Sequence, residues 1–164
     1  MKWIEKEVAK AIRRGDKELK WVTPSGFVVY QKLNKKITEK VKLQLLGRVE
    51  ITVSTEDSDK VDINHHKNAT SPNLIHSLDA SILCLSALRF DAPISLIHDS
   101  VLCRATDMSS LSSIVRETYM HIFGERSYLE EWASQIGADT TDLADIIIGD
   151  LATESVIEST YFFC

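Results

Sequence analysis

Pro93-Ile94-Ser95-Leu96-Ile97-His98-Asp99-Ser100-Val101-Leu102-Cys103 sets two short apolar runs on either side of a polar triplet. Ile, Leu and Val favour strands and the polar residues favour the bend between them, so the stretch predicts a two-stranded β-hairpin. The carboxylate of Asp99 would lie at its end. Mg²⁺ takes hard oxygen donors and usually only one or two protein carboxylates, which makes Asp99 a candidate metal ligand. A solvated turn aspartate is the alternative, and a triplet this short, taken alone, favours that alternative.

A second polar pattern lies upstream, in Pro72-Asn73-Leu74-Ile75-His76-Ser77-Leu78-Asp79-Ala80. Pro72 can open a helix, and apolar residues then recur on one side of it through residue 85. His76 and Asp79 are neighbours at i, i+3, so the carboxylate could orient the imidazole for a contact in a nucleic-acid minor groove. A histidine that lines the core and is satisfied by its own helix is an equally good interpretation of the residues alone.

The segment from Lys40 to Ser54 alternates between apolar and polar residues with period two. This pattern predicts a two-stranded ribbon that turns near Gly47. A β-ribbon fits the DNA major groove, where each base pair presents its own pattern of donors and acceptors. An ordinary hairpin with one wet face explains the alternation as well, and sequence alone favours it.

The remaining segments are read more coarsely. The N-terminus predicts an amphipathic helix that ends at Gly15, and residues 24–26 predict a turn followed by a short strand. Residues 54–71 are polar and are expected to form a loop, in which the pair His65-His66 has no nearby carboxylate or cysteine at metal-ligand spacing. Helices are expected in three further segments, residues 109–125, 128–136 and 139–148.

Length and composition narrow the class of protein. The chain has 164 residues, 44% of them hydrophobic, which suits one ordinary domain with a buried core. Three cysteines without C-x-x-C spacing predict neither a disulfide framework nor a zinc site. The sequence has no apolar run of the length that a membrane span requires. Residues 1–48 carry a formal charge of +8 and residues 49–164 one of −13, which suggests a basic arm for phosphates and an acidic body.

Four ordered motifs together resemble one family. Trp21-Val22-Thr23-Pro24-Ser25-Gly26-Phe27, the P-N-x-x-H-S-x-D and I-H-D-S motifs, and the aromatic tail Glu158-Ser159-Thr160-Tyr161-Phe162-Phe163-Cys164 are similar to the C-terminal part of single-subunit DNA-directed RNA polymerases of bacteriophages and mitochondria. The resemblance implies an α+β fold: part of a polymerase palm and fingers, with an inserted DNA-reading β-hairpin. Helices would pack around a short antiparallel hairpin that carries the catalytic aspartate.

The resemblance also implies a division of the chain and a role for each motif. Residues 1–38 would form a basic helix and lead-in strand, residues 39–66 the promoter-specificity hairpin and loop, and residues 67–164 the C-terminal palm region with its aromatic tail. Asp99 would bind catalytic Mg²⁺, with His98 beside the primer end. The other implied positions are Asn73 and His76 at the nucleic acid, Lys40, Lys42, Glu50 and Thr52 at promoter bases, and Phe163 and Cys164 near the active site.

The partners implied by the resemblance are double-stranded promoter DNA, template DNA, the RNA product and ribonucleoside triphosphates. The family's other metal-binding aspartate, in a D-G motif, and its triphosphate-handling lysine and tyrosine have no counterpart in the chain. One carboxylate cannot assemble a two-metal site, so we expect the chain to be inactive without the N-terminal part of the polymerase. The chain would then be a split subunit, an expressed piece or the product of a truncated gene, located in the cytoplasm of an infected bacterial host and not in a membrane.

Two other functions remain open from the sequence. The first is a non-catalytic DNA-binding remnant of such a polymerase, which keeps the ribbon without a partner. The second, ranked well below it, is a metal-dependent phosphohydrolase of the HD type, suggested by His65, His66, His76 and the pair His98-Asp99. Those enzymes generally place the His-Asp pair on a helix, whereas residues 94–102 predict strands.

Overall fold

The structure is a computed structural model that describes residues 2–43, 49–124, 127–143 and 152–162. The described elements are α1 (Lys2–Arg14), β1 (Leu19–Val22), β2 (Val28–Gln31), β3 (Asn34–Leu43), β4 (Val49–Val61), α2 (Ile63–Arg89), β5 (Ile94–Ile97), β6 (Ser100–Cys103), α3 (Met108–Phe123), α4 (Tyr128–Gln135) and α5 (Ser155–Glu158), with 3₁₀ turns at Ala105–Asp107 and Thr141–Leu143. The strands pair as three antiparallel hairpins, β1-β2, β3-β4 and β5-β6. The fold is therefore α+β with short hairpins, as predicted.

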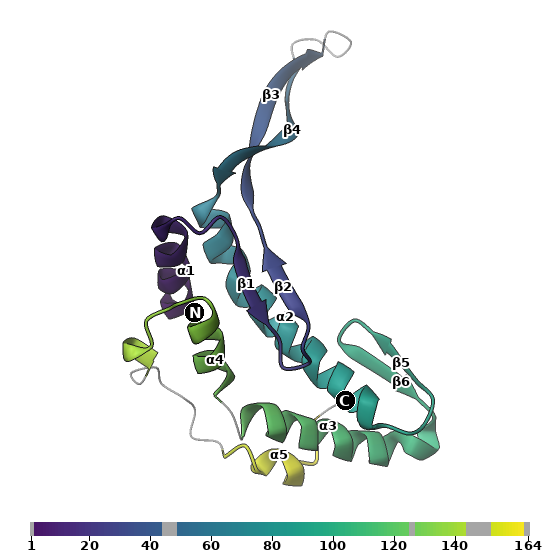
Figure 1. The fold of residues 1–164 in the computed structure, drawn as a ribbon. Coiled ribbons are helices and arrows are strands. Elements are labelled where there is room, and N and C mark those ends of the chain that lie inside the picture. The colour runs from purple at the N-terminus through teal and green to yellow at the C-terminus, as the bar shows by residue number, and fades with distance from the viewer. Residues whose placement is uncertain (1, 44–48, 125–126, 144–151, 163–164) are drawn as a thin grey trace.

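Helix α2 is the longest of the described helices, and Figure 1 shows the other elements arranged around it. Apolar residues of α2 between Ile63 and Leu85 pack with α1, the β1-β2 hairpin and α4 around a core in which Val8, Trp21 and Trp132 have at most 1% of their surface exposed. Burial of such large apolar side chains is the main stabilising contribution, at about 1.5–3 kcal/mol for each side chain fully removed from water. Helix α1 ends at Arg14 as predicted, and Gly15 follows it with φ of +113°, a conformation that favours glycine.

A second, smaller cluster holds the β5-β6 hairpin. Phe90, Leu111 and Val115 are buried, and the hairpin packs against them through Ile94 and Val101. The larger cluster thus holds α1, α2, α4 and the β1-β2 hairpin together, and the smaller one fixes the β5-β6 hairpin to α3 and the C-terminal end of α2. The predicted strands on both sides of His98-Asp99 are confirmed.

The expected loop at residues 54–71 is wrong. Strand β4 continues to Val61, and α2 begins at Ile63 with Asp62 as its N-cap, whose carboxylate accepts a hydrogen bond of 3.0 Å from the backbone N–H of His65. Pro72 therefore does not open the helix but lies inside it. An interior proline costs a helix about 3 kcal/mol. The first turns of α2 persist because they are buried against the body, His66 and Thr70 having no exposed surface.

The other helix predictions hold with small changes of boundary. Helix α3 covers the predicted segment 109–125 as far as Phe123, and α4 covers 128–136 as far as Gln135. The segment 139–148 begins with the 3₁₀ turn at Thr141–Leu143, and its remainder lies outside the described residues. Among the described residues, no helix combines the length and apolar character that a membrane crossing would need.

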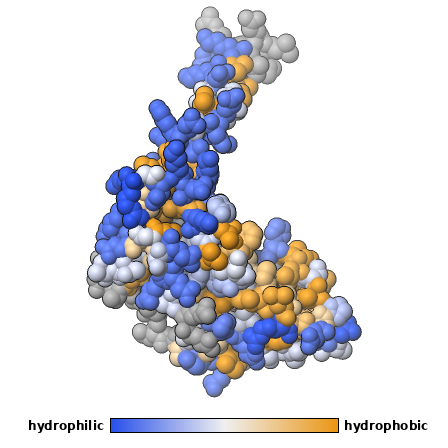
Figure 2. Space-filling model, viewed as in Figure 1, coloured by the Kyte–Doolittle hydropathy of each residue, from blue (hydrophilic) through white to orange (hydrophobic). Residues whose placement is uncertain are grey.

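Strands β3 and β4 form a long ribbon that stands out from the body, as Figure 1 shows. The predicted turn near Gly47 falls outside the described residues. Most described side chains of the ribbon are exposed, and Figure 2 shows polar residues over much of its visible surface, with a few apolar ones between them. The ribbon is longer than predicted because β3 begins at Asn34 and β4 continues to Val61.

Candidate nucleic-acid interface

The register of the ribbon brings the four predicted base-contacting residues onto one face. Lys40 lies directly opposite Thr52, and Lys42 lies directly opposite Glu50. Side chains two residues apart on a strand share a face, so these two cross-strand pairs are neighbours. The face presents cationic donors, one carboxylate acceptor and one hydroxyl within a compact patch.

The Glu50 carboxylate is shared between the two lysines. Its oxygens lie 3.9 Å from Lys40 Nζ and 3.6 Å from Lys42 Nζ. The side chains of Lys40, Lys42 and Glu50 are 74%, 80% and 50% exposed, so water screens the attraction. These weak contacts can give way to a ligand with little loss of stability.

The opposite face of the ribbon is mainly apolar, with Glu39 directly opposite Val53. Ile37, Val41, Ile51 and Val53 lie there, each between 42% and 45% exposed. A shift of register by one residue would exchange the two faces, so the alternation fixes which side chains a ligand meets. Between Ile37 and Thr38 the register shifts, with Thr55 as the extra residue on β4, which locally increases the twist of the ribbon.

The predicted residues of α2 lie beside the turn between β1 and β2. Asn73 and His76 are both exposed and line a hollow of about 470 Å³ whose floor includes the exposed ring of Phe27. No hydrogen bond or ion pair joins the described side chains of His76 and Asp79, so the imidazole is not oriented as the i, i+3 spacing suggested. The hollow is lined by Thr23, Ser25, Phe27, Val29, Asn73, His76, Ser77, Ala80 and Cys84.

His98 and Asp99 form the two-residue turn between the paired residues Ile97 and Ser100. His98 has φ of +55°, the one positive value found among the described non-glycine residues, and such strain is often stored at functional positions. The Asp99 carboxylate is exposed and accepts a hydrogen bond of 3.4 Å from Ser100 Oγ. An exposed carboxylate on a rigid turn fits the donor chemistry that Mg²⁺ requires.

The rest of a metal site is not assembled in the part of the chain that the structure describes. No group of three or more His, Cys, Asp or Glu side chains there could hold a metal ion. The histidines behind the phosphohydrolase alternative are therefore not gathered into a ligand cluster, and His66 is buried among protein groups instead. Asp99 can contribute one carboxylate, with the remaining ligands supplied from elsewhere.

The aromatic tail approaches α3. The ring of Phe162 lies 5.1 Å from the ring of Tyr119 and 5.4 Å from the guanidinium of Arg116, measured to ring centroids. Phe163 and Cys164, which the resemblance places near the active site, lie outside the described residues.

Sequence reasoning missed a buried polar network around His66. The backbone N–H of Leu33 donates to His66 Nε2 at 3.1 Å, and the side-chain amide of Gln31 lies 3.2 Å from His66 Nδ1. The same amide lies 2.8 Å from the Thr70 hydroxyl and 2.8 Å from the amide of Asn73. The available signal was the spacing of His66, Thr70 and Asn73 at i, i+4 and i+7, which is helical only if residues 63–71 are read as helix.

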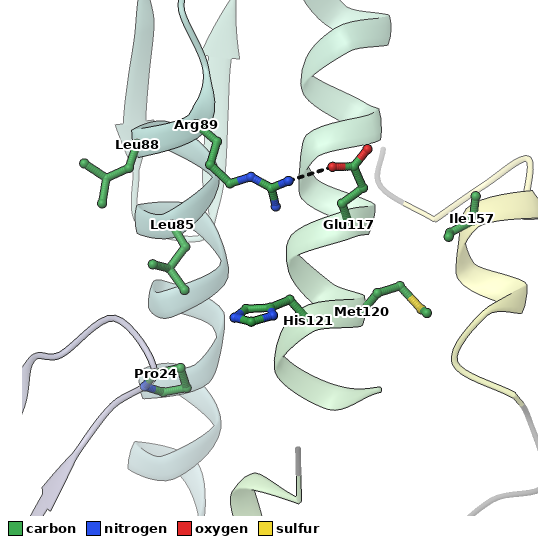
Figure 3. Close-up of a pocket in the computed structure, with 8 residues that line it drawn as sticks. All are labelled: Pro24, Leu85, Leu88, Arg89, Glu117, Met120, His121 and Ile157. Carbon is green, nitrogen blue, oxygen red and sulfur yellow. Dashed lines mark hydrogen bonds and ion pairs between the residues drawn. The ribbon is translucent and has the colours of Figure 1, made fainter. Parts of the chain in front are cut away.

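A larger hollow, of about 710 Å³, lies between α2, α3 and α5 and holds none of the predicted residues. Figure 3 shows the ion pair of Arg89 and Glu117 at one end, with an N···O distance of 2.7 Å, and His121 facing Pro24 and Leu85 across the other. The lining is mainly apolar, its one carboxylate is paired with Arg89, and it includes no lysine, unlike the polar face of the ribbon. The candidate interface therefore consists of the ribbon, the exposed edge of α2 and the β5-β6 turn.

Comparison with known proteins identifies the family. Residues 1–147 match the model of the DNA-dependent RNA polymerase family, and the chain belongs to it. The chain is 35% identical over its whole length to the DNA-directed RNA polymerase of Pseudomonas phage phiKMV, and the match covers 20% of that polymerase. It is 27% identical over 98% of its length to the polymerase of Enterobacteria phage K11 and 29% identical over 96% to mitochondrial DNA-directed RNA polymerase 1 of Arabidopsis thaliana. The chain spans about a fifth or less of the length of these relatives. The predicted resemblance is confirmed.

Proposed function

We propose that this chain is the C-terminal part of a phage-type DNA-directed RNA polymerase and supplies a promoter-reading ribbon and one Mg²⁺-binding carboxylate. The observation that carries the proposal is the register of β3 and β4, which gathers Lys40, Lys42, Glu50 and Thr52 on one exposed face. The family membership supports template-directed nucleotidyl transfer as the reaction.

The ribbon would read promoter DNA in the major groove. Lysine donates to the O6 and N7 acceptors of guanine, glutamate accepts from the amino group of cytosine, and threonine serves either way. Lys42 and Glu50 would therefore recognise complementary features of neighbouring base pairs. The weak, exposed ion pairs between them are exchanged for these contacts at little cost.

The edge of α2 and the β5-β6 turn would face the growing RNA and its template. Asn73 and His76 present an amide and an imidazole at the rim of the hollow beside Phe27, and both groups can bond to minor-groove acceptors and ribose hydroxyls. Asp99 would hold Mg²⁺, with His98 beside the RNA 3′ end. When bound, the metal ions supply activation of the 3′ hydroxyl and neutralisation of charge on the departing pyrophosphate.

The proposed partners are promoter and template DNA, the RNA product, ribonucleoside triphosphates and the N-terminal part of the polymerase, in the cytoplasm of an infected bacterial host. Asp99 alone does not complete a two-metal site among the described residues, so we expect no extension of RNA by this chain without that part. The other candidate, a DNA-binding remnant, would keep the ribbon contacts and lack the chemistry even when the N-terminal part is supplied.

The test is a chimera in which this chain replaces the matching segment of the phiKMV polymerase. Exchanging Lys42 and Glu50 (Lys42→Glu with Glu50→Lys) keeps the net charge and the cross-strand pair but inverts the donor and acceptor. We expect promoter choice to change by about 1–3 kcal/mol per contact, while extension of a preassembled primer and template is unchanged.

The matched control exchanges Lys36 and Asp57, another oppositely charged cross-strand pair of the same ribbon. This pair lies about 20 Å nearer the body than the Lys42–Glu50 pair, at about 3.3 Å per residue, so its exchange should leave promoter choice unaltered. Equal loss on every template in the Lys42 and Glu50 variant would assign these residues to folding. Promoter binding by a chimera that cannot extend RNA, although the phiKMV polymerase itself can, would favour the remnant.

A further inference from the structure

Leu33 lies at the base of the ribbon, where its backbone groups bond to the residue after β4 and to a side chain of α2. Its carbonyl accepts a hydrogen bond of 2.9 Å from the backbone N–H of Asp62, which follows the end of β4. Its own N–H, just before the start of β3, donates to His66 Nε2 at 3.1 Å. Both polar backbone groups at the base of the ribbon are therefore fixed, one by the far end of the ribbon and the other by a side chain of α2.

His66 is held rigidly enough to act as an anchor. It has no exposed surface and lies on the first turns of α2, and Nδ1 faces the side-chain amide of Gln31 at 3.2 Å. Gln31 is itself buried and also meets the amide of Asn73, which stands at the exposed edge of α2. A continuous chain of hydrogen bonds thus joins the base of the ribbon to the proposed nucleic-acid contact on the helix.

We propose that His66 is a positioning residue that fixes the direction in which the ribbon leaves α2, and thereby the placement of Lys42 and Glu50 relative to Asn73 and His76. The positioning rests on the hydrogen bonds alone, and its effect on promoter choice rests on the proposed function.

Because the ribbon is long, a small rotation at its base causes a large displacement of its reading face. From Leu33 to Lys42 a strand spans about 30 Å at about 3.3 Å per residue. A rotation of about 10° at the base would move Lys42 by about 5 Å, which exceeds the spacing of about 3.4 Å between successive bases on a DNA strand. A rotation of this size about Leu33 would therefore move the reading face by more than one base.

The geometry also selects one tautomer of His66. A backbone N–H can only donate, so Nε2 must be the unprotonated nitrogen, and the proton of the neutral ring lies on Nδ1. The structure places Gln31 Nε2 3.2 Å from this nitrogen, and Gln31 Oε1 accepts from Asn73 Nδ2 at 2.8 Å. Turning over the side-chain amides of both Gln31 and Asn73 puts an acceptor at the Nδ1–H and keeps the hydrogen bond between the two amides. The Thr70 hydroxyl lies within reach of the amide and of the His66 carbonyl, at 2.8 and 2.7 Å, and can donate to either.

The test measures the direction of the ribbon in the full chain without DNA. Spin labels are placed at Glu39 and Asp79, both exposed, after the native cysteines are replaced by serine. His66→Gln can keep an acceptor near the position of Nε2, whereas His66→Asn, shorter by one methylene, cannot reach Leu33. We expect a narrow distance distribution in the parent and in His66→Gln, and one broadened or displaced by several ångströms in His66→Asn.

A merely structural role would not reproduce this pattern, because both amides bury a polar group of similar chemistry. Equal, narrow distributions in a folded His66→Asn variant would overturn the proposal. If His66→Asn does not fold, ¹⁵N NMR of the parent imidazole above pH 7.5 decides. Protonation on Nδ1 supports the proposal, and protonation on Nε2 overturns it because the bond from Leu33 could not exist.

The consequence for DNA is measured separately in the phiKMV chimera. We expect His66→Asn to reduce discrimination between promoter variants about tenfold or more, and His66→Gln to restore it, the wrong base at one contact being worth about 1–3 kcal/mol. A ribbon that moves in His66→Asn with no change of promoter choice would support the positioning role and contradict the proposed reading function instead.

Discussion

The β3-β4 ribbon and the β5-β6 hairpin are both antiparallel, yet they present their polar residues differently. The ribbon gathers four of them in two cross-strand pairs on one long exposed face. The hairpin presents a single carboxylate, Asp99, on a two-residue turn next to the strained backbone of His98. The ribbon extends away from the body, whereas the hairpin rests on a buried cluster at Leu111 and Val115.

The difference follows from how each kind of surface is assembled. A face that reads hydrogen-bonding groups is complete once the register of two adjacent strands is set, because the alternation of side chains brings its residues together. A two-metal site needs carboxylates from segments far apart in the chain, held at fixed distances. The proposed reading face can therefore be complete within this chain, whereas the proposed metal site would need ligands besides Asp99.

The strongest test of the hairpin is Asp99→Asn in the phiKMV chimera. If Asp99 holds Mg²⁺ as proposed, loss of its charge should remove several kcal/mol of transition-state stabilisation, or about a thousandfold in rate. Single-nucleotide extension at saturating Mg²⁺ measures this loss. Promoter binding, which the proposal assigns to the ribbon, should be retained.

Two companions make this test specific. Asp99→Glu keeps the charge on a longer arm and should also be inactive, because octahedral Mg²⁺ tolerates misplaced ligands poorly. Asp91→Asn, at an exposed aspartate between α2 and β5, should extend RNA normally. Full turnover by Asp99→Asn would show that His98-Asp99-Ser100 is a turn without catalytic function.

A second prediction concerns the buried packing beneath the β5-β6 hairpin, in comparison with the exposed β3-β4 ribbon. Leu111, 4% exposed, packs in the cluster beneath β5 and β6, so Leu111→Ala should lower the free energy of unfolding by about 2–5 kcal/mol. Hydrogen exchange should speed up more in β5-β6 than in the backbone of β3-β4, because local stability follows local packing.

Leu88→Ala is the control for this comparison. Leu88 is 82% exposed on α2, and its truncation should change the free energy of unfolding by no more than about 0.5 kcal/mol. Denaturant unfolding measures both variants. Equal acceleration of exchange in the ribbon and the hairpin would mean that the two regions unfold as one unit.

The same contrast explains what the sequence could predict. The alternation from Lys40 to Ser54 predicted the ribbon because neighbouring residues carry the whole signal, and the apolar runs at 94–97 and 101–103 predicted the second hairpin in the same way. Residues 55–60 are polar and most of them have weak intrinsic strand propensity, so their sequence favours a loop. β3 pairs with Glu56 and Asp57 across the ribbon, a contact that local reasoning does not detect.

The start of α2 was missed for a related reason. Residues 63–71 have few apolar side chains, and Pro72 suggested a helix start at the wrong place. The buried contacts of His66 and Thr70 with Gln31 stabilise these turns, and Gln31 lies more than thirty residues away in the sequence. Asp62 was a usable local signal, since aspartate is a preferred N-cap.

The anchor of the ribbon should be sensitive to acid. Burial lowers the pKa of His66 below its ordinary value, with a further lowering by His65, while Asp62 opposes it. Because the folded pKa lies below the unfolded one, the unfolded state binds more protons as the pH falls below about 6.5. The stability contributed by His66 is therefore fully present above pH 6.5 and is lost as the pH falls toward the folded pKa.

Thermal unfolding between pH 8 and pH 5 measures this contribution. The parent should lose more stability over that range than His66→Gln, whose amide does not titrate. Parallel curves for the two proteins would contradict it. The protonated ring has no acceptor for the Leu33 N–H, so the Glu39–Asp79 label distance should broaden in the same pH range.

The smallest expected effect is the change in melting temperature caused by Glu50→Gln, which tests whether the polar face of the ribbon contributes to stability. Glu50 contacts Lys40 and Lys42 at 3.9 and 3.6 Å, and all three side chains are at least half exposed. Exposed ion pairs of this kind contribute about 0–1 kcal/mol, so Glu50→Gln should leave the melting temperature of the chain nearly unchanged.

Glu7→Gln is the contrasting variant. Glu7 is 2% exposed, and its carboxylate accepts from the backbone N–H of Asp139 at 3.1 Å and from Lys10 Nζ at 2.6 Å. A buried carboxylate that satisfies two donors is costly to change, so Glu7→Gln should destabilise the chain more than Glu50→Gln does. Thermal unfolding of both variants at low and moderate salt gives the ordering. If Glu50→Gln were the more destabilising of the two, the polar face of the ribbon would be held together by its own ion pairs, and its residues would be less free to exchange those pairs for contacts with DNA.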